Sequence, residues 1–314
     1  MHDNRSNVPA DTPRLRPPRR VRRRILRTTS AWPSLVTLGN GVAGFAAVHF
    51  ATKPLPPEQI AAGEAAAGTW VAGNLVIAAW MIFAGMLCDA VDGSLARRTG
   101  QTSEFGAELD SLCDAVTFGV APALLMLRAV QAELFSFVQE VDILPRATLA
   151  GRAVWFVAAV YASCALLRLA RFNVENAPDP IGHRSFKGLP SPAAAMSVTS
   201  LVLLHAHLVS TTEPLLRAAW LPDLVIWLLP AVTLGSGLLM VSQVRFAHLA
   251  NTYLRGRRPF SYIVWMAIIA LAALTYFRIV LAVTSLAYVL SGPVRVAWRK
   301  WRGGMDRTDE DETD

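Results

Sequence analysis

Long apolar runs constrain this chain more than any other feature of its sequence. Crossing a bilayer as a helix takes about 20 apolar residues, and several runs reach that length. Charged residues make up only 17% of the chain, against about 25% in soluble proteins. The sequence therefore predicts an all-α integral membrane protein and excludes a disordered, collagen-like or disulfide-rich one. The expected membrane segments are roughly 34–51, 70–90, 107–127, 150–170, 190–209, 222–242, 260–276 and 279–294.

Positive charge is distributed unevenly along the chain. Residues 1–30 contain nine arginines. If the N-terminus lies in the cytoplasm and eight helices alternate, 24 lysines and arginines fall on the cytoplasmic side and six on the other. Such an excess marks the cytoplasmic side of membrane proteins. We therefore expect both tails in the cytoplasm. We expect no nucleic-acid partner, because arginines beside a membrane anchor the chain to anionic lipid.

Four aspartates stand out because they lie where the second and third apolar segments meet. Asp89 and Asp92 are spaced i, i+3, and Asp110 and Asp114 are spaced i, i+4, so each pair shares one face of a helix. Gly100 can supply the turn that lets the two faces meet. A charge inside a bilayer costs several kcal/mol, so four converging acids need cations to neutralise them.

Hard divalent cations with oxygen ligands are the natural partners of such a cluster, which predicts Mg²⁺ or Mn²⁺. Four carboxylates can hold two ions about 4 Å apart, a geometry that serves phosphoryl transfer. Gly93 and Ala96 leave room for a group against the helix, and Arg97 and Arg98 lie where an anionic phosphate would arrive. Two other interpretations stay open, an acidic helix end solvated at the interface and a path for divalent-cation transport.

The residues between Asp89 and Asp114 resemble a family motif. The CDP-alcohol phosphotransferases carry D-x2-D-G-x2-A-R-x8-G-x3-D-x3-D, and this chain matches it without a gap. The matching residues are Asp89, Asp92, Gly93, Ala96, Arg97, Gly106, Asp110 and Asp114. The resemblance implies a six-helix membrane core, usually dimeric, with a two-metal site on the cytoplasmic side and a CDP-linked lipid donor.

The resemblance also implies a role for each motif residue. The first three aspartates bind metal, and Asp114 lies beside the metals and acts as general base, so all four count as metal-site candidates. The candidates for contact with the CDP-lipid are Gly93, Ala96, Arg97, Ser103, Gly106, Thr37 and Asn40.

Three further segments, 33–40, 168–173 and 186–194, look like the membrane-type phosphatidylserine synthases, the CDP-diacylglycerol–serine O-phosphatidyltransferases. Ser34 departs from that pattern, which commonly has Asn after the proline. The resemblance implies two extra C-terminal helices beyond the core. The expected division is a basic cytoplasmic tail (1–31), a catalytic membrane domain (32–245), a loop with two helices (246–294) and a cytoplasmic tail (295–314). The expected location is a bacterial inner (plasma) membrane.

The implied reaction is direct displacement, in which the hydroxyl of L-serine attacks the phosphatidyl phosphorus of CDP-diacylglycerol and CMP leaves. Other acceptors, namely glycerol phosphate, inositol phosphate or choline, stay open, as does a divalent-cation carrier. The serine carboxylate needs a cationic seat, and Arg171 is the favoured candidate because its fork can pair with both oxygens. The full set of serine-binding candidates is Arg168, Arg171, Asn173, Lys187 and Ser191.

Overall fold

The computed structural model describes residues 31–99, 104–140, 145–175, 188–211, 218, 220–244, 246 and 276–311. Within these ranges all regular elements are helices and no strand occurs. In chain order they are α1 (Ala31–Thr52), α2 (Pro57–Ala61), α3 (Glu64–Thr99), α4 (Glu104–Asp114), the π-helix η2 (Ala115–Val120), α5 (Ala121–Glu140), α6 (Pro145–Glu175), α7 (Ser191–Ser210), α8 (Trp220–Val241) and α11 (Phe277–Asp311).

Seven helical spans in the described part of the chain are long and apolar enough to cross a membrane. They coincide with seven of the eight predicted segments, which confirms the all-α membrane protein expected from the sequence. The remaining segment, 260–276, lies outside the described residues except for Tyr276. The total of eight membrane helices, and the turn at Gly100, therefore stay predictions.

Two helices extend beyond their predicted apolar segments. The second apolar segment was expected to end near residue 90, and α3 continues beyond it to Thr99, so Asp89 and Asp92 lie on one helix, as their spacing predicted. The last segment was expected to end near residue 294, but α11 continues to Asp311. Polar residues end a membrane span without ending a helix, and the extension of α11 contains Arg, Lys and Glu, which are good helix formers.

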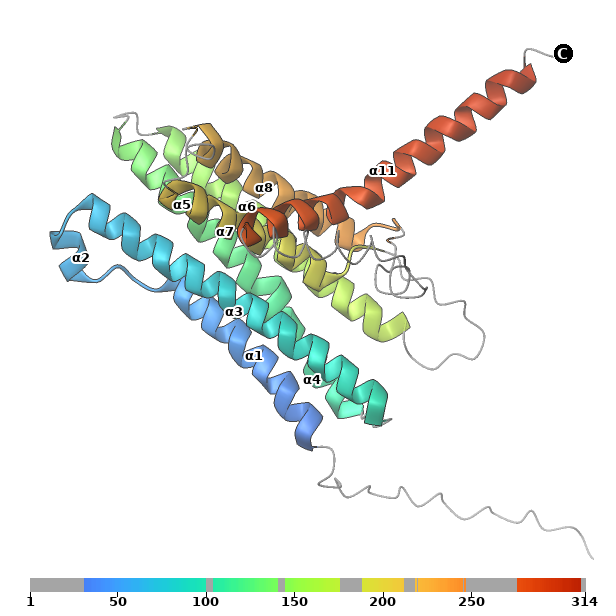
Figure 1. Ribbon diagram of the computed structural model, residues 1–314, viewed down its shortest axis with the longest axis horizontal. Coiled ribbons are helices and arrows are strands. Elements are labelled where there is room, and N and C mark those ends of the chain that lie inside the picture. The colour runs from blue at the N-terminus through green and yellow to red at the C-terminus, as the bar shows by residue number, and fades with distance from the viewer. Residues whose placement is uncertain are drawn as a thin grey trace, which may run out of the picture.

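Helix α1 packs along α3 and also contacts α4 and η2 (Figure 1). Its glycines permit this close approach. A Cβ on Gly44 would lie 2.2 Å from Thr117 Oγ1 and 2.8 Å from Thr117 Cα, and a Cβ on Gly41 would lie 2.8 Å from Cys113 Sγ. The polar half of α1 is thereby held against the helices that carry the four aspartates.

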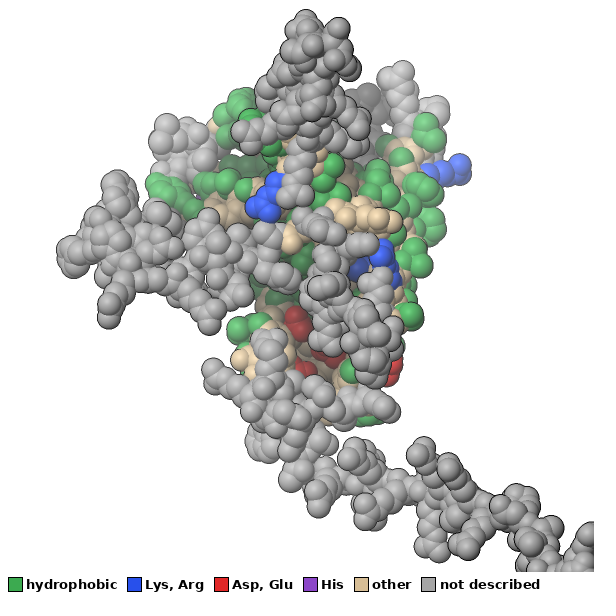
Figure 2. All heavy atoms as spheres, turned by 90° about the vertical axis from the view of Figure 1, so that its right-hand side faces the viewer, with side chains coloured by type: hydrophobic (Ala, Val, Ile, Leu, Met, Phe, Trp, Pro, Cys, Tyr) green, Lys and Arg blue, Asp and Glu red, His purple; other side chains and the backbone are tan. Residues whose placement is uncertain are grey.

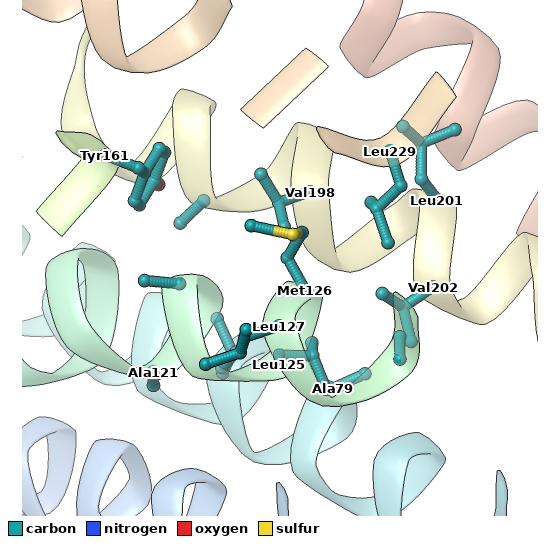
Figure 3. Close-up of a cluster of buried hydrophobic side chains, with 14 of the residues drawn as sticks. Ala79, Ala121, Leu125, Met126, Leu127, Tyr161, Val198, Leu201, Val202 and Leu229 are labelled. Atoms are coloured by element: carbon teal, nitrogen blue, oxygen red, sulfur yellow. The ribbon is translucent and has the colours of Figure 1, made fainter. Parts of the chain in front are cut away.

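Helix α5 forms the centre of the apolar core. The span that contains it has the largest buried share of the seven. Figure 3 shows Leu125, Met126 and Leu127 of α5 between side chains of the neighbouring helices, including Ala79 of α3 and Val198 of α7. This packing fixes α5, and with it the position of η2 and α4 at its N-terminal end.

The π-helix η2 joins α4 to α5 without a break in the helical chain. Its residues Thr117, Phe118 and Gly119 are buried. The hydroxyl of Tyr161 on α6, itself fully buried, donates a hydrogen bond to the Phe118 carbonyl at 3.1 Å. A π-helix is rare and frequently occurs at functional sites, and this one begins directly after Asp114.

We expect Gly44→Ala to destabilise the protein. The added methyl would meet the backbone of Thr117, so α1 has to move away from η2, at a cost of about 1–3 kcal/mol. The apparent melting temperature of the purified protein in detergent should fall. Gly73→Ala is the matched control, because a Cβ there meets nothing within 4 Å and alanine favours a helix. An equal effect of both substitutions would contradict the close approach of α1.

Candidate functional site

The four predicted aspartates meet at one end of the bundle. Figure 2 looks onto this end and shows acidic side chains together in its lower half, with basic side chains above them. The helical spacing within each pair presents both carboxylates to the same side. Because α1 packs against both α3 and α4, its polar residues lie between the two pairs.

Three of the four carboxylates form a compact cluster. One oxygen from each of Asp89, Asp110 and Asp114 lies within 4.8 Å of the others, and all three side chains are half-buried. Two oxygens that bind the same Mg²⁺ lie at most about 4.2 Å apart, and two that bind the same Ca²⁺ at most about 5.2 Å, so these oxygens have to approach one another by only about 0.6 Å to share a Mg²⁺ ion. The carboxylate-only donor set suits hard divalent cations such as Mg²⁺ and Mn²⁺.

Asp92 lies beside this cluster and has a different partner. Its side chain is only 8% exposed, and its carboxylate accepts a hydrogen bond from the hydroxyl of Thr37 on α1. It remains close enough to Asp89 and Asp110 to repel both. Its role as a metal ligand stays a prediction, since its oxygens are not among the three that converge.

Asp114 is held by a buried amide. Asn40 Nδ2 on α1 donates to Asp114 Oδ1 at 2.9 Å, and the Asn40 side chain is fully buried. Thr117 Oγ1 in turn donates to the Asn40 backbone carbonyl at 2.9 Å. A Cβ on Gly85 would lie 2.9 Å from Asn40 Oδ1 and 2.5 Å from Thr117 Cγ2. Only glycine at position 85 therefore leaves room for this arrangement.

The sequence did not point to Thr117 or Gly85. A hydroxyl one helical turn after Asp114, within an otherwise apolar run, was the signal for Thr117. Nothing local marks Gly85, because its importance comes from the approach of α1. Asn40 was expected beside the CDP-lipid, and the structure shows its amide bonded to Asp114; contact with the donor stays a prediction.

The positive side of the site comes from α6. The half-buried Arg168 lies close enough to Asp89 and Asp114 for charge–charge attraction. Its Nη1 donates a hydrogen bond to the hydroxyl of Ser191 at the start of α7. Farther along α6, the Asn173 side-chain oxygen accepts a hydrogen bond from Ser111 on α4 at 3.0 Å. These contacts bring three of the five predicted serine-binding residues next to the carboxylates.

The structure shows less about the other predicted contact residues. Arg171 is exposed on α6, and Lys187 and Ser103 lie outside the described residues. Gly93 and Gly106 are partly buried next to the aspartates on α3 and α4. Ala96 and Arg97 lie on the last turns of α3, and their side chains are outside the described part. These residues stay predictions.

Two backbone hydrogen bonds just before α7 position Ser191. Gly188 adopts a positive φ of 90°, and its N–H donates to the Val244 carbonyl at 2.9 Å. Leu189 N–H donates to the Leu239 carbonyl at 3.0 Å. A Cβ on Gly188 would lie 2.4 Å from the Met240 carbonyl oxygen. This glycine therefore ties the start of α7 to the end of α8 and fixes the hydroxyl that Arg168 contacts.

Comparison with known proteins agrees with this geometry. A family model described as CDP-alcohol phosphatidyltransferase matches residues 31–235. A protein of Helicobacter pylori named CDP-diacylglycerol–serine O-phosphatidyltransferase is 36% identical over 177 residues, which cover 55% of this chain and 61% of that protein. A Bacillus subtilis protein of the same name is 32% identical over 216 residues, 69% of this chain and 89% of that protein.

A third relative, from Mycobacterium tuberculosis, also bears that name. It is 28% identical over 272 residues, which cover 86% of this chain and 79% of that protein. The similarity to the Helicobacter pylori protein thus spans less than two thirds of its length, whereas the other two are matched over most of theirs.

We expect Asp110→Asn to weaken the binding of divalent ions. The substitution removes one of the three converging carboxylates, and loss of even an outer partner of a metal ligand typically costs 10–100-fold in affinity, so at least about tenfold is expected here. Mn²⁺ binding to the purified protein, followed by electron paramagnetic resonance, measures the effect. Glu108→Gln is the matched control, since it removes an exposed carboxylate from the same helix. Unchanged Mn²⁺ affinity in Asp110→Asn would rule out the cluster as a metal site.

Proposed function

Since this chain belongs to the CDP-alcohol phosphatidyltransferase family, we propose that it transfers the phosphatidyl group of CDP-diacylglycerol to the hydroxyl of L-serine. The products are phosphatidylserine and CMP. The observation that carries the proposal is the convergence of Asp89, Asp110 and Asp114 opposite Arg168. The names of the three relatives support serine as the acceptor.

Asp89, Asp92 and Asp110 would hold Mg²⁺ or Mn²⁺ in a site for two ions, and Asp114 completes the cluster beside them. When bound, the ions neutralise negative charge on the diphosphate of the donor. The chain's own contribution is the fixed geometry of the carboxylates. Asp92 is oriented by Thr37 and Asp114 by Asn40, so neither has to reorganise when the substrate arrives.

Asp114 is the proposed general base. A serine hydroxyl is a weak nucleophile and has to lose its proton as the new bond forms. Asn40 donates to one oxygen of Asp114, which leaves the other oxygen available to accept that proton. Serine Oγ then bonds to the phosphorus that carries diacylglycerol, the bond from this phosphorus to the bridging oxygen breaks, and CMP leaves with the electron pair.

Arg168 is the proposed seat for the serine carboxylate. It lies beside the acidic cluster, and its guanidinium already contacts a hydroxyl, that of Ser191. Its planar fork can pair with two carboxylate oxygens. Arg168 thus takes the place for which Arg171 was favoured from the sequence, because Arg171 is exposed. Arg171, Lys187 and Asn173 remain candidates for further contacts with the acceptor.

The same proposal places the site on the cytoplasmic side of a bacterial inner membrane. The bias of 24 positive residues against six supports this orientation, because α1 begins at the end of the bundle where the aspartates lie. The donor would reach the site from the bilayer, and serine from the cytoplasm. A homodimer belongs to the proposal on the strength of the family resemblance.

The decisive test is incubation of the purified protein with CDP-diacylglycerol, Mg²⁺ or Mn²⁺ and labelled serine. We expect labelled phosphatidylserine and an equal amount of CMP, and a loss of about 10²–10⁴-fold in rate for Asp114→Asn, as for other general bases. Parallel reactions with glycerol phosphate, inositol phosphate and choline examine the other acceptors. CMP release with one of these alone would replace serine, and metal flux in liposomes without CMP release would indicate a carrier.

We expect Arg168→Lys to raise the KM for serine by about tenfold, because a hydrogen bond between charged groups contributes about 1.5–3 kcal/mol and lysine cannot form the bidentate pair. The KM for CDP-diacylglycerol should change little. Steady-state kinetics with each substrate varied in turn measure both values. Arg152→Lys is the control, as an exposed arginine near the other end of α6. If serine KM is unchanged in Arg168→Lys, the carboxylate binds elsewhere.

A further inference from the structure

The last helix is longer than a membrane span requires. Helix α11 covers Phe277–Asp311, but only Phe277–Trp298 is apolar enough to cross the bilayer. At 1.5 Å per residue, about 20 residues suffice for the hydrocarbon core. The helical residues after Trp298 therefore lie beyond the hydrocarbon.

Two contacts fix the end of the bundle at which α11 leaves. Ser285 Oγ lies 2.8 Å from Ser200 Oγ, and Arg278 Nη1 lies 3.4 Å from His207 Nδ1. Ser200 and His207 are seven residues apart along α7, and their partners Ser285 and Arg278 are seven residues apart in the opposite order along α11. The two helices are therefore antiparallel. If the same pairing continues nine residues beyond Ser285 and Ser200, Val294 lies at the level of Ser191. Helix α11 therefore emerges on the membrane face where the acidic site lies.

The packing of α11 on the protein changes at this level. Upstream, Phe277 stacks on Trp80, and Gly292 faces Phe246 so closely that a Cβ would lie 2.5 Å from its ring. Pro293 follows within the helix, and proline is a common cause of helix bends. Beyond it Val294 is 59% exposed and Trp298 57% exposed. Figure 1 shows this part of α11 leaving the bundle and running across the direction of α1 and α3.

The sequence of α11 from Val294 to Met305 is amphipathic. Its apolar positions follow the i, i+3, i+4, i+7, i+11 spacing of a single helix face, and they are Val294, Ala297, Trp298, Trp301 and Met305. Cationic positions lie on both sides of this stripe, and they are Arg295, Arg299, Lys300 and Arg302. Tryptophan and basic residues around an apolar stripe are typical of helices that lie in the plane of a membrane surface.

We infer that Val294–Met305, which contains four cations and no acid, is an interfacial helix that binds anionic phospholipid headgroups on the membrane face of the acidic site. The apolar stripe enters the leaflet, and the four cations pair with the phosphates. Each lysine or arginine near an anionic surface contributes about 1 kcal/mol, or about fivefold in affinity. The inference concerns lipid binding only and does not depend on the proposed activity.

Amide hydrogen exchange of the full chain in nanodiscs tests this inference. With zwitterionic phosphatidylcholine alone, the amides of residues 296–305 should exchange fast. Adding about 30 mol% of anionic phosphatidylglycerol should slow them by at least about tenfold, in view of the four cations. The protection should be lost at about 0.5 M salt, where the screening length falls well below 8 Å.

The variant that removes the interaction is Arg295→Gln/Arg299→Gln/Arg302→Gln, whose exchange should be fast in both lipid compositions. Arg22→Gln/Arg23→Gln/Arg24→Gln is the control, because it removes the same charge from the N-terminal tail and should keep the protection of α11. Equal exchange in the two lipid compositions would overturn the inference, as would protection that the α11 variant retains. Either result would mean that protein contacts, not headgroups, cover this helix.

Discussion

Negative charge inside an apolar bundle is the constraint on which the rest of this structure depends. Carboxylates at membrane depth are costly unless they are paired or bind a cation, and Asp89, Asp110 and Asp114 converge within 4.8 Å. The fold compensates for this negative charge in two ways. Asn40 and Arg168 supply a hydrogen bond and a positive charge at fixed positions, and the remaining charge calls for divalent ions. A site built to hold those ions is also suited to a diphosphate substrate.

The hydrogen bonds of the site depend on how closely the helices pack. Asn40 reaches Asp114 because Gly44 and Gly85 let α1 approach η2 and α3. Similar contacts occur at the other side of the site, where Gly188 ties α7 to α8. The apolar core around α5 therefore does more than stabilise the bundle. It sets the distances between polar groups that come from helices far apart in the sequence.

The fold class and the acidic cluster could be predicted because their signals are local. Apolar runs of bilayer length mark the helices, and the helical spacing of Asp89, Asp92, Asp110 and Asp114 assigns each pair to one face. The distinction between Asp92 and the other three could not be predicted, because it comes from Thr37 on a different helix. For the same reason the sequence could not show that Arg168 is half-buried and Arg171 exposed, although both lie on the same helix. Their burial depends on the tertiary packing of α6.

The hydrogen-bond pattern of η2 is as important to the site as the composition of this segment. Each residue of an α-helix turns the chain by about 100°. The wide π-turn advances less per residue, so the six residues Ala115–Val120 turn the chain about as far as five α-helical residues do. If the same six residues formed ordinary α-helix, α4 would be rotated relative to α5 by about that angle. Asp110 and Asp114 would then face away from α1, although every residue of the site is still present. The wide turn therefore works as an adapter between the two helices, because it holds one extra residue and still keeps the acidic face of α4 turned toward α1.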